Sequence, residues 1–455
     1  MGRGNRRTAS KVTAIQRKPD LSETKNRMRV KLAEKKGDVQ LCLTMIVKNE
    51  SRNMVRLLDS LKGIIDMISI VDTGSTDNTI EVIYNWSKEN GDIPCKVHQE
   101  TFQNFAYNRT HSAIVAKKTF PEADYLLLSD ADFVWDIHVG SKFNKRLLVD
   151  HKYLVEQYNK AIKYWNVRLL STKVDFECVG VTHEYWIEKN TQTSYQGEVR
   201  TAKITTLMID DREDGGCKDD KFDRDERLLK QELLNPTKEN SHILTRYKFY
   251  LGQTLKDKGR FLESIEWYQK RVDDGGWEEE VYYGLYQIGR CYDNCYKLMN
   301  MWLQNEKEPN DALKNELDKY NVYDDYPSLT PHEAEEKAAM FFQKAEAFYL
   351  NAFFKRKTRL ESLCALVEMM RNKREYKKAY DYAKLGLNTP YPVQDSLFIE
   401  TACYEYKLQL ELSIVCYYLP EHKQEGADMV EFLLYAKNIP DGVREVATMN
   451  AKYYI

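Results

Sequence analysis

The first part of the chain alternates short apolar segments with amphipathic ones, and this alternation limits the folds open to it. Residues 40–50 (QLCLTMIVKNE), 67–74 (MISIVDTG) and 123–133 (ADYLLLSDADF) are rich in aliphatic and β-branched residues, as buried strands are. Residues 51–64 and 78–91 carry apolar residues at helical spacing. Strands that alternate with helices indicate βαβ units around a mostly parallel sheet.

Each of these predicted strands ends in polar side chains that can do chemistry. Asn49 and Glu50 follow the first strand, Asp72 ends the second, and Asp130 and Asp132 close the later one. In open α/β sheets, ligands bind at the carboxyl edge, where such strand ends gather. An ordinary connection with a helix cap explains any one of them alone, so the argument for a site depends on their combination.

The segment SDADF carries the strongest chemical signal. Asp130 and Asp132 are two residues apart, and on a regular strand they would face the same side of the sheet. Neighbouring carboxylates repel each other unless a cation joins them, and hard oxygen ligands suit Mg²⁺ or Mn²⁺. A divalent ion there would take up the charge that develops on a departing diphosphate. The motif therefore predicts a metal site that assists the loss of a nucleoside diphosphate.

The second half of the chain has a different texture, with helical periodicity and few strand signals. In residues 246–272, an apolar, small and aromatic pattern typical of a tetratricopeptide unit is formed by Leu251, Gly252, Phe261, Ser264 and Tyr268. We expect an α-solenoid there, with an irregular helical bundle as the alternative. The predicted division is a basic, disordered leader (1–38), an α/β domain (39–215) and an all-α, tetratricopeptide-like domain (216–455).

Charge and cysteine usage narrow the class of protein further. The net charge of the chain is −2, yet residues 1–38 hold twelve Lys/Arg against four Asp/Glu, a balance typical of a solvated tail. No apolar run reaches the roughly 18–20 residues that span a bilayer. The nine cysteines are scattered without a zinc-site spacing, which predicts reduced thiols in a cytoplasmic protein. We expect no membrane span and no nucleic-acid partner.

Several segments in order resemble a known family. LTMIVKNES, VDTGSTDNT, FAYNRT and LLLSDADF resemble the family 2 glycosyltransferases of the GT-A fold. GVTHEYW, DGGCKDDKFDRDERLL and GGWEEEVYYGLYQIGRCY are similar to a subgroup from bacteria and large DNA viruses with a tetratricopeptide-like region behind the catalytic domain. The resemblance covers about residues 40–450. It implies an inverting transfer from a nucleotide sugar, usually a UDP-sugar, aided by Mn²⁺ or Mg²⁺, in the cytoplasm (the host's, if the protein is viral).

The resemblance also implies a set of donor-binding residues. Asp72 would accept a hydrogen bond from the edge of the base, and Arg109 would bind the donor phosphates, for which a guanidinium is suited. The full set of predicted nucleotide-sugar-binding residues is Thr44, Ile46, Asn49, Glu50, Asp72, Asn108, Arg109 and Asp130.

An inverting enzyme needs a base that deprotonates the acceptor hydroxyl. Glu184, in VTHEYW, is the predicted base, and Asp132 is the second predicted catalytic residue through its metal. His183 is a candidate metal ligand, though it would also serve to orient Glu184 or to pack. Asp211, with Asp214 as the alternative, is the candidate for a later metal ligand, and solvated loop charges are the simpler explanation for both.

Two other functions compete with a sugar transferase. The chain would be a peptide-binding scaffold if its α/β domain had lost activity, but the intact carboxylate pair argues against that. A nucleotidyltransferase usually has a Gly-rich, Arg-containing loop after the first strand, where this chain has VKNES. The helical half is predicted to bind the glycan or protein acceptor, to form a homodimer, or both, because repeat arrays present extended binding surfaces.

Overall fold

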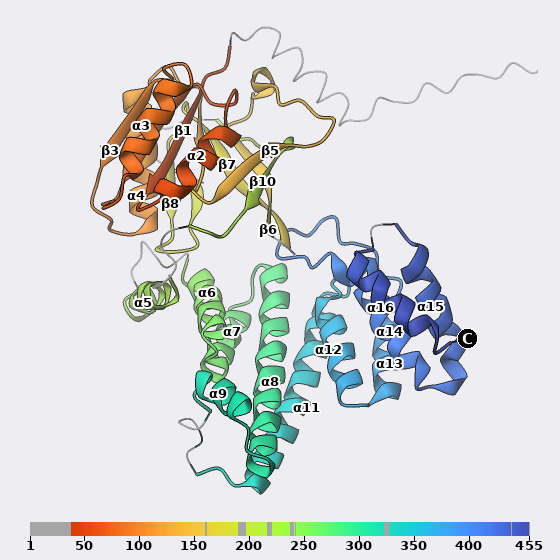
Figure 1. Cartoon of the computed structure of the whole chain (residues 1–455). Helices are drawn as coiled ribbons and strands as arrows, with labels where there is room; N and C mark the ends of the chain where they lie inside the picture. The colour runs from red at the N-terminus through yellow and green to blue at the C-terminus, as the bar shows by residue number, and fades with distance from the viewer. Residues whose placement is uncertain are drawn as a thin grey trace, which may run out of the picture.

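The structure of the chain is a computed structural model. It describes residues 38–159, 162–189, 197–215, 221–236, 241, 243–322, 326, 328–437 and 439–454. The predicted disordered leader, residues 1–38, lies outside this range except for Asp38. A sheet with its covering helices is followed by a long series of helices (Figure 1), which confirms the predicted order of an α/β part and an all-helical part.

The described strands form one large sheet and a separate hairpin. The eight-stranded sheet has the order β3-β2-β1-β4-β7-β6-β10-β5, and β8 and β9 pair with each other. The pairs β1–β2, β2–β3, β1–β4 and β6–β10 are parallel, whereas β4–β7, β6–β7 and β5–β10 are antiparallel. The strands are β1 (Leu41–Val47), β2 (Met67–Asp72), β3 (Cys95–Gln99), β4 (Tyr125–Leu128), β5 (Phe133–Ile137), β6 (Lys152–Asn159), β7 (Ile162–Ser171), β8 (Phe176–Val179), β9 (Tyr185–Glu188) and β10 (Thr201–Asp211).

Helices cover both faces of the sheet because the strands in its middle are apolar on both sides. Leu43 and Met45 of β1 pack with α2 (Ser51–Ser60) and α3 (Thr79–Glu89). Cys42, which points to the other face, belongs to a core shared with α4 (Phe105–Thr119) and the β8–β9 hairpin. Alternate residues of one strand therefore feed two separate cores.

One sequence-based expectation about strand length is wrong. β4 ends at Leu128, and Ser129 to Asp132 form a turn before β5 begins at Phe133. Asp130 and Asp132 therefore do not share a face by strand alternation, as the sequence predicted. The turn instead sends Asp130 toward α4 and β7, where its ion-pair partners lie.

The helical part consists of helices that pack against their neighbours in sequence. Contacts join α6 with α7, α8 with α11, α12 with α13 and α14 with α15. The helices are α5 (Lys221–Leu234), α6 (Leu244–Asp257), α7 (Phe261–Asp273), α8 (Glu278–Lys307), α9 (Asp311–Lys319), α11 (Pro331–Lys355), α12 (Glu361–Asn372), α13 (Tyr376–Gly386), α14 (Leu408–Tyr417), α15 (Lys423–Tyr435) and α16 (Asp441–Ala451).

Glycine permits the close packing of two of these helix pairs. A Cβ on Gly252 of α6 would lie 2.9 Å from the ring of Tyr268 on α7. A Cβ on Gly289 of α8 would lie 2.6 Å from the ring of Tyr349 on α11. Each glycine therefore provides the space that a buried tyrosine ring fills. Among the described helices, none is long and apolar enough to cross a membrane.

Candidate functional site

The ends of β1 and β2 meet and are fixed by hydrogen bonds between their loops. Asn49 adopts a positive φ of 56°, and its side-chain oxygen accepts from the backbone N–H of Thr76 at 2.7 Å. The Glu50 N–H donates to the hydroxyl of Thr79 at 2.8 Å. An asparagine tolerates this left-handed backbone better than most residues. The structure thus brings Asn49 and Glu50 to the same edge as Asp72, as predicted for parallel strands.

Asp72 has one oxygen in use and one without a partner. Its Oδ1 accepts from the N–H groups of Gly74 and Ser75, at 3.0 Å each. Within the described residues, its Oδ2 is buried and makes no hydrogen bond. Such an atom is costly to bury unless something donates to it. Asp72 therefore has a free acceptor at the carboxyl end of β2.

Arg109 of α4 lies between two carboxylates. Its Nη2 contacts Asp130 Oδ1 at 2.5 Å, and its Nε forms an ion pair with Glu184. The pKa of Asp130 is lowered, because Arg109 and Arg168 together outweigh the effect of burial. The predicted phosphate-binding residue and the predicted base are thus in direct contact.

Arg168 of β7 makes the second contact with Asp130. Its Nη1 lies 3.3 Å from Asp130 Oδ2, and its Nη2 donates to Gln157 of β6 at 2.8 Å. The guanidinium also lies 4.5 Å from the centre of the Phe133 ring. Asp130 is therefore held by two arginines, one on each side, and this orients its carboxylate firmly.

Asp132 is in the opposite situation, because carboxylates surround it. Within the described part of the chain, it forms no ion pair. Burial raises its pKa to about 6, and the charges of Asp130, Asp211 and Glu50 add to the effect. A Cβ on Gly215 would lie 3.3 Å from Asp132 Oδ2 and 3.4 Å from Glu50 Oε1. Gly215 therefore leaves a space that both carboxylates border.

A divalent metal at this edge of the sheet would need hard oxygen ligands. The chemistry of the donor set fits, since carboxylate oxygens are suitable ligands for Mg²⁺ or Mn²⁺. Across the described ranges, however, no three His, Cys, Asp or Glu side chains are already arranged around one point as ligands. A Mg²⁺ ion held here would need further oxygen ligands, such as those of a substrate or water.

The other candidate metal ligands are placed differently. Asp211 accepts from the Gln157 side chain at 3.0 Å, and burial raises its pKa. Asp214 forms a two-point ion pair with Arg56, with contacts of 2.7 and 2.6 Å. The ring of His183 stacks on Tyr250 of α6, and burial lowers its pKa to about 3. Of these, Asp211 is the residue whose charge reaches Asp132.

The remaining predicted donor residues divide into cavity-lining and structural ones. Thr44 is buried and donates to the backbone oxygen of Ser112 at 3.1 Å. Ile46 is half-buried, next to Val71 of β2. The amide of Asn108 is fully buried, accepting from Gln103 at 2.9 Å and donating to Thr101 at 3.1 Å. Asn108 thus holds the segment that leads into α4.

A small cavity of about 50 Å³ connects several of these residues. Its lining combines apolar side chains with both arginines and both of their carboxylate partners. The lining residues are Thr44, Met45, Arg109, Ser112, Leu128, Asp130, Asn166, Val167, Arg168, Glu184 and Trp186.

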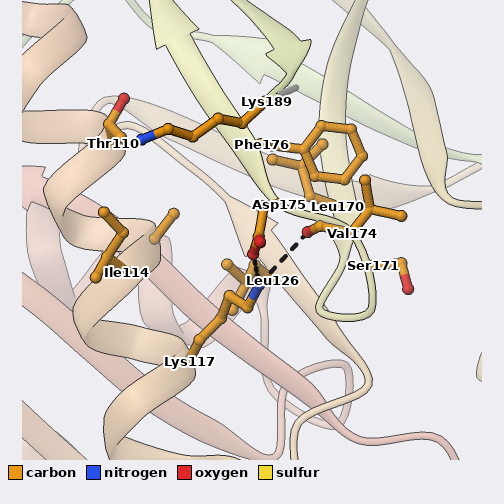
Figure 2. Close-up of a pocket in the computed structure, with 11 residues that line it drawn as sticks. Thr110, Ile114, Lys117, Leu126, Leu170, Ser171, Val174, Asp175, Phe176 and Lys189 are labelled. Atoms are coloured by element: carbon orange, nitrogen blue, oxygen red, sulfur yellow. Dashed lines mark hydrogen bonds and ion pairs between the residues drawn. The ribbon is translucent and has the colours of Figure 1, made fainter. Parts of the chain in front are cut away.

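A larger cavity of about 230 Å³ lies between α4 and the strands β7 and β8, and Figure 2 shows it. Its floor is apolar, with Leu126, Leu170 and Phe176. Its one carboxylate, Asp175, already pairs with Lys117 at 2.7 Å. This cavity shares none of the residues of the smaller one and offers no free acidic group, so we place the candidate site at the strand ends.

Two members of the site were missed by sequence reasoning. The sequence analysis assigns no role to Arg168 or Gln157. Both lie on the β6–β7 hairpin, which the sequence did not pair with the Asp130 turn. Their signal is a polar residue at an otherwise buried position: Arg168 is 7% and Gln157 2% exposed.

Comparison with protein families gives a match over most of the sheet-forming part of the chain. Residues 42–173 match the model of glycosyl transferase family 2. The match runs from β1 to just beyond β7, and includes Asp72, Arg109 and Asp130 but not Glu184. Among curated proteins, no match is found. The matched segment supports a glycosyltransferase.

Proposed function

We propose that the protein is an inverting, metal-assisted glycosyltransferase. Its donor is a nucleotide sugar, with UDP-sugars as the first choice, and its acceptor is a hydroxyl group of a glycan or protein. The observation that carries the proposal is Asp132, a carboxylate crowded by like charges at the carboxyl edge of a sheet matching glycosyl transferase family 2. A metal and a diphosphate would relieve this crowding.

The donor nucleoside occupies the edge formed by β1 and β2. Asp72 Oδ2 has the free acceptor that a base N–H, such as that of uracil, would satisfy. Asp130, held by Arg109 and Arg168, is oriented to accept from a ribose hydroxyl. Asn49 and Glu50 form the adjoining wall through their loop hydrogen bonds.

Asp132 would be the main protein ligand for a divalent metal, with Glu50 and Asp211 near it. When bound, the metal supplies positive charge to the leaving diphosphate. His183 remains a predicted ligand, and its ring would have to leave Tyr250 to act as one.

Glu184 acts as the base. Its ion pair with Arg109 orients the carboxylate. The donor diphosphate competes for Arg109 and frees Glu184 to accept the proton of the acceptor hydroxyl. The acceptor oxygen then attacks the anomeric carbon on the face opposite the departing diphosphate, and the configuration inverts.

The helical half binds the acceptor. We assign it a tetratricopeptide-like architecture, with the domain division at residues 39–215 and 216–455. The successive helix pairs and the close Gly252–Tyr268 contact support this assignment.

A thermal-shift panel of nucleotide sugars with Mn²⁺ tests the proposal. A donor at 100 times its dissociation constant should stabilise the protein by about 2.7 kcal/mol. Asp132→Ala should remove the Mn²⁺-dependent part of this shift. Asp136→Ala, at an exposed carboxylate on β5, is the matched control and should leave it unchanged. Equal Mn²⁺ responses in the parent and Asp132→Ala would overturn the metal assignment, and no response to any nucleotide sugar would overturn the function.

A further inference from the structure

The loop that carries Glu184 has an unusual backbone. It joins β8 to β9 and consists of residues 180–184, called here the Glu184 loop. Gly180 has a φ of 115°, and His183, immediately before Glu184, has a φ of 51°. A positive φ at a non-glycine residue is disfavoured, so the surroundings must hold it in place.

The surroundings that hold this loop belong to the helical half of the chain. The Val181 N–H donates to the hydroxyl of Tyr247 at 3.1 Å. Arg246 Nη2 donates to the backbone oxygen of His183 at 3.2 Å. The His183 ring stacks on Tyr250, with centroids 3.8 Å apart and planes at 5°. These partners come from one stretch of α6, which lies close below the sheet in Figure 1.

Two further features restrict the same loop: a hydrogen bond to α5 and the tight space around Gly180. Thr182 donates a hydrogen bond to Asp225 of α5. A Cβ on Gly180 would lie 3.4 Å from Ile243, next to the start of α6, and 3.1 Å from the Cα of Glu184. The loop therefore has little room to take another conformation.

The side chain of Glu184 is held from the other direction. Its carboxylate pairs with Arg109 of α4, and its side chain is 15% exposed. The Arg246 guanidinium lies 5.2 Å from the ring centre of Tyr185, the residue after Glu184. The carboxylate is thus anchored to the sheet domain, while its backbone is anchored to α6.

We propose that Arg246, Tyr247 and Tyr250 are positioning residues that act through the Glu184 loop, so that the helical half sets the geometry of the base. This inference rests on the proposed function, because it gives the loop a catalytic purpose. Under this proposal, the helical half positions the base in addition to binding the acceptor. Without α6, the loop loses the partners that keep His183 at positive φ, and the carboxylate loses its alignment with the acceptor.

The test compares variants of α6 in the full chain. Tyr250→Ala removes the stacked ring, and Tyr250→Phe keeps it. Tyr247→Phe removes a single hydroxyl with almost no change in volume, so it provides a variant that folds even if Tyr250→Ala does not. Arg371→Ala, which breaks an ion pair with Glu411 far along the same helical region, is the matched control.

The measured quantities are kcat, the donor KM and hydrogen exchange of residues 180–185. Tyr250→Ala should lower kcat at least about tenfold, since a 1 Å misplacement can cost on the order of 100-fold. Tyr247→Phe should lower kcat by about threefold to tenfold, in line with the loss of one hydrogen bond of about 1 kcal/mol. Donor KM should stay unchanged in both, and their loop amides should exchange faster. Arg371→Ala should match the parent, and Tyr250→Phe, which keeps the ring but loses its hydrogen bond with Arg246, should fall between the parent and Tyr250→Ala.

The outcomes separate this inference from the proposed function. If Tyr247→Phe and a folded Tyr250→Ala keep the parent kcat, or exchange at residues 180–185 is unchanged, the positioning role is wrong while the transferase stands. If the parent turns over no nucleotide sugar, the function is wrong, and hydrogen exchange alone decides whether α6 holds the loop. A rise in donor KM with constant kcat would also overturn the inference.

Discussion

Buried charges are arranged in two different ways in the two halves of the molecule. In the helical half, Arg359 and Glu361 are completely buried and contact each other at 2.9 Å, and Arg271 pairs with Glu280 in the same way. At the sheet edge, burial raises the pKa of Asp132 to about 6, and the charges of neighbouring carboxylates add to the effect. A buried charge that has a counter-charge in the protein is stabilised by that partner. A buried carboxylate without one indicates that a bound ligand supplies the positive charge.

The largest effect is expected when a buried ion pair of the helical half is broken. Arg359→Ala leaves Glu361 buried without a counter-charge, and we expect a loss of about 3–5 kcal/mol in the free energy of unfolding. Urea unfolding measures it. Mn²⁺ should stabilise the variant as much as the parent. Replacing both partners, Arg359→Met with Glu361→Leu, should recover much of the loss; an equally unstable double variant would contradict the explanation.

The second prediction is a loss of catalysis with no loss of stability. Glu184→Gln keeps the shape of the side chain but removes the base, and we expect kcat to fall by about 10²–10⁴-fold. Steady-state kinetics and a thermal-shift measurement of donor affinity check this. Glu177→Gln, on β8 of the same hairpin, is the control and should keep the parent kcat. A fully active Glu184→Gln would remove Glu184 from the mechanism.

A smaller effect is the pH dependence of stability that Asp132 causes. The folded pKa of Asp132 is raised from 3.8 to about 6, so between these pH values the unfolded chain ionises first and the native state loses stability as pH rises. Asp132→Asn removes this penalty. Without metal, it should be more stable than the parent by up to about 3 kcal/mol at pH 7, and equal to it below about pH 4. Thermal melts with a chelator across this range would show it; parallel curves for the two proteins would contradict it.

The smallest effect checks that the helical half can be weakened without touching the site. Thr330 caps α11, and it shares a capping box with Glu333. Thr330→Ala should cost about 1 kcal/mol of stability. The Mn²⁺ response and kcat should remain those of the parent. A changed Mn²⁺ response would show that the two halves are coupled beyond the Glu184 loop.

The sequence predicts the parts of the site that depend on local pattern. Apolar strands followed by polar residues were enough to bring Asn49, Glu50 and Asp72 to one edge, because parallel strands end together. The turn after Leu128 was not predicted, since an apolar run does not show where hydrogen bonding to β1 stops. Consequently, the sequence placed Asp130 and Asp132 on the same face of one strand, whereas the structure gives them different surroundings.

Contacts between distant segments could not be read from the sequence. Arg168 reaches Asp130 only because β7 pairs antiparallel with β4. Tyr250 reaches His183 across 67 positions in the chain. Neither contact leaves a periodic or compositional signal, because a stacked tyrosine and a packed one look alike in sequence.

The large sheet also contacts a segment late in the helical half. Lys163 of β7 forms an isolated antiparallel bridge with Ile399, in the segment between α13 and α14. Together with the α6 contacts, this bridge connects the sheet to two places in the helical half. These places lie about 150 residues apart in the sequence. A catalytic fragment that ended after β10 would leave both attachment points bare. Heating should therefore melt the whole protein as a single cooperative unit.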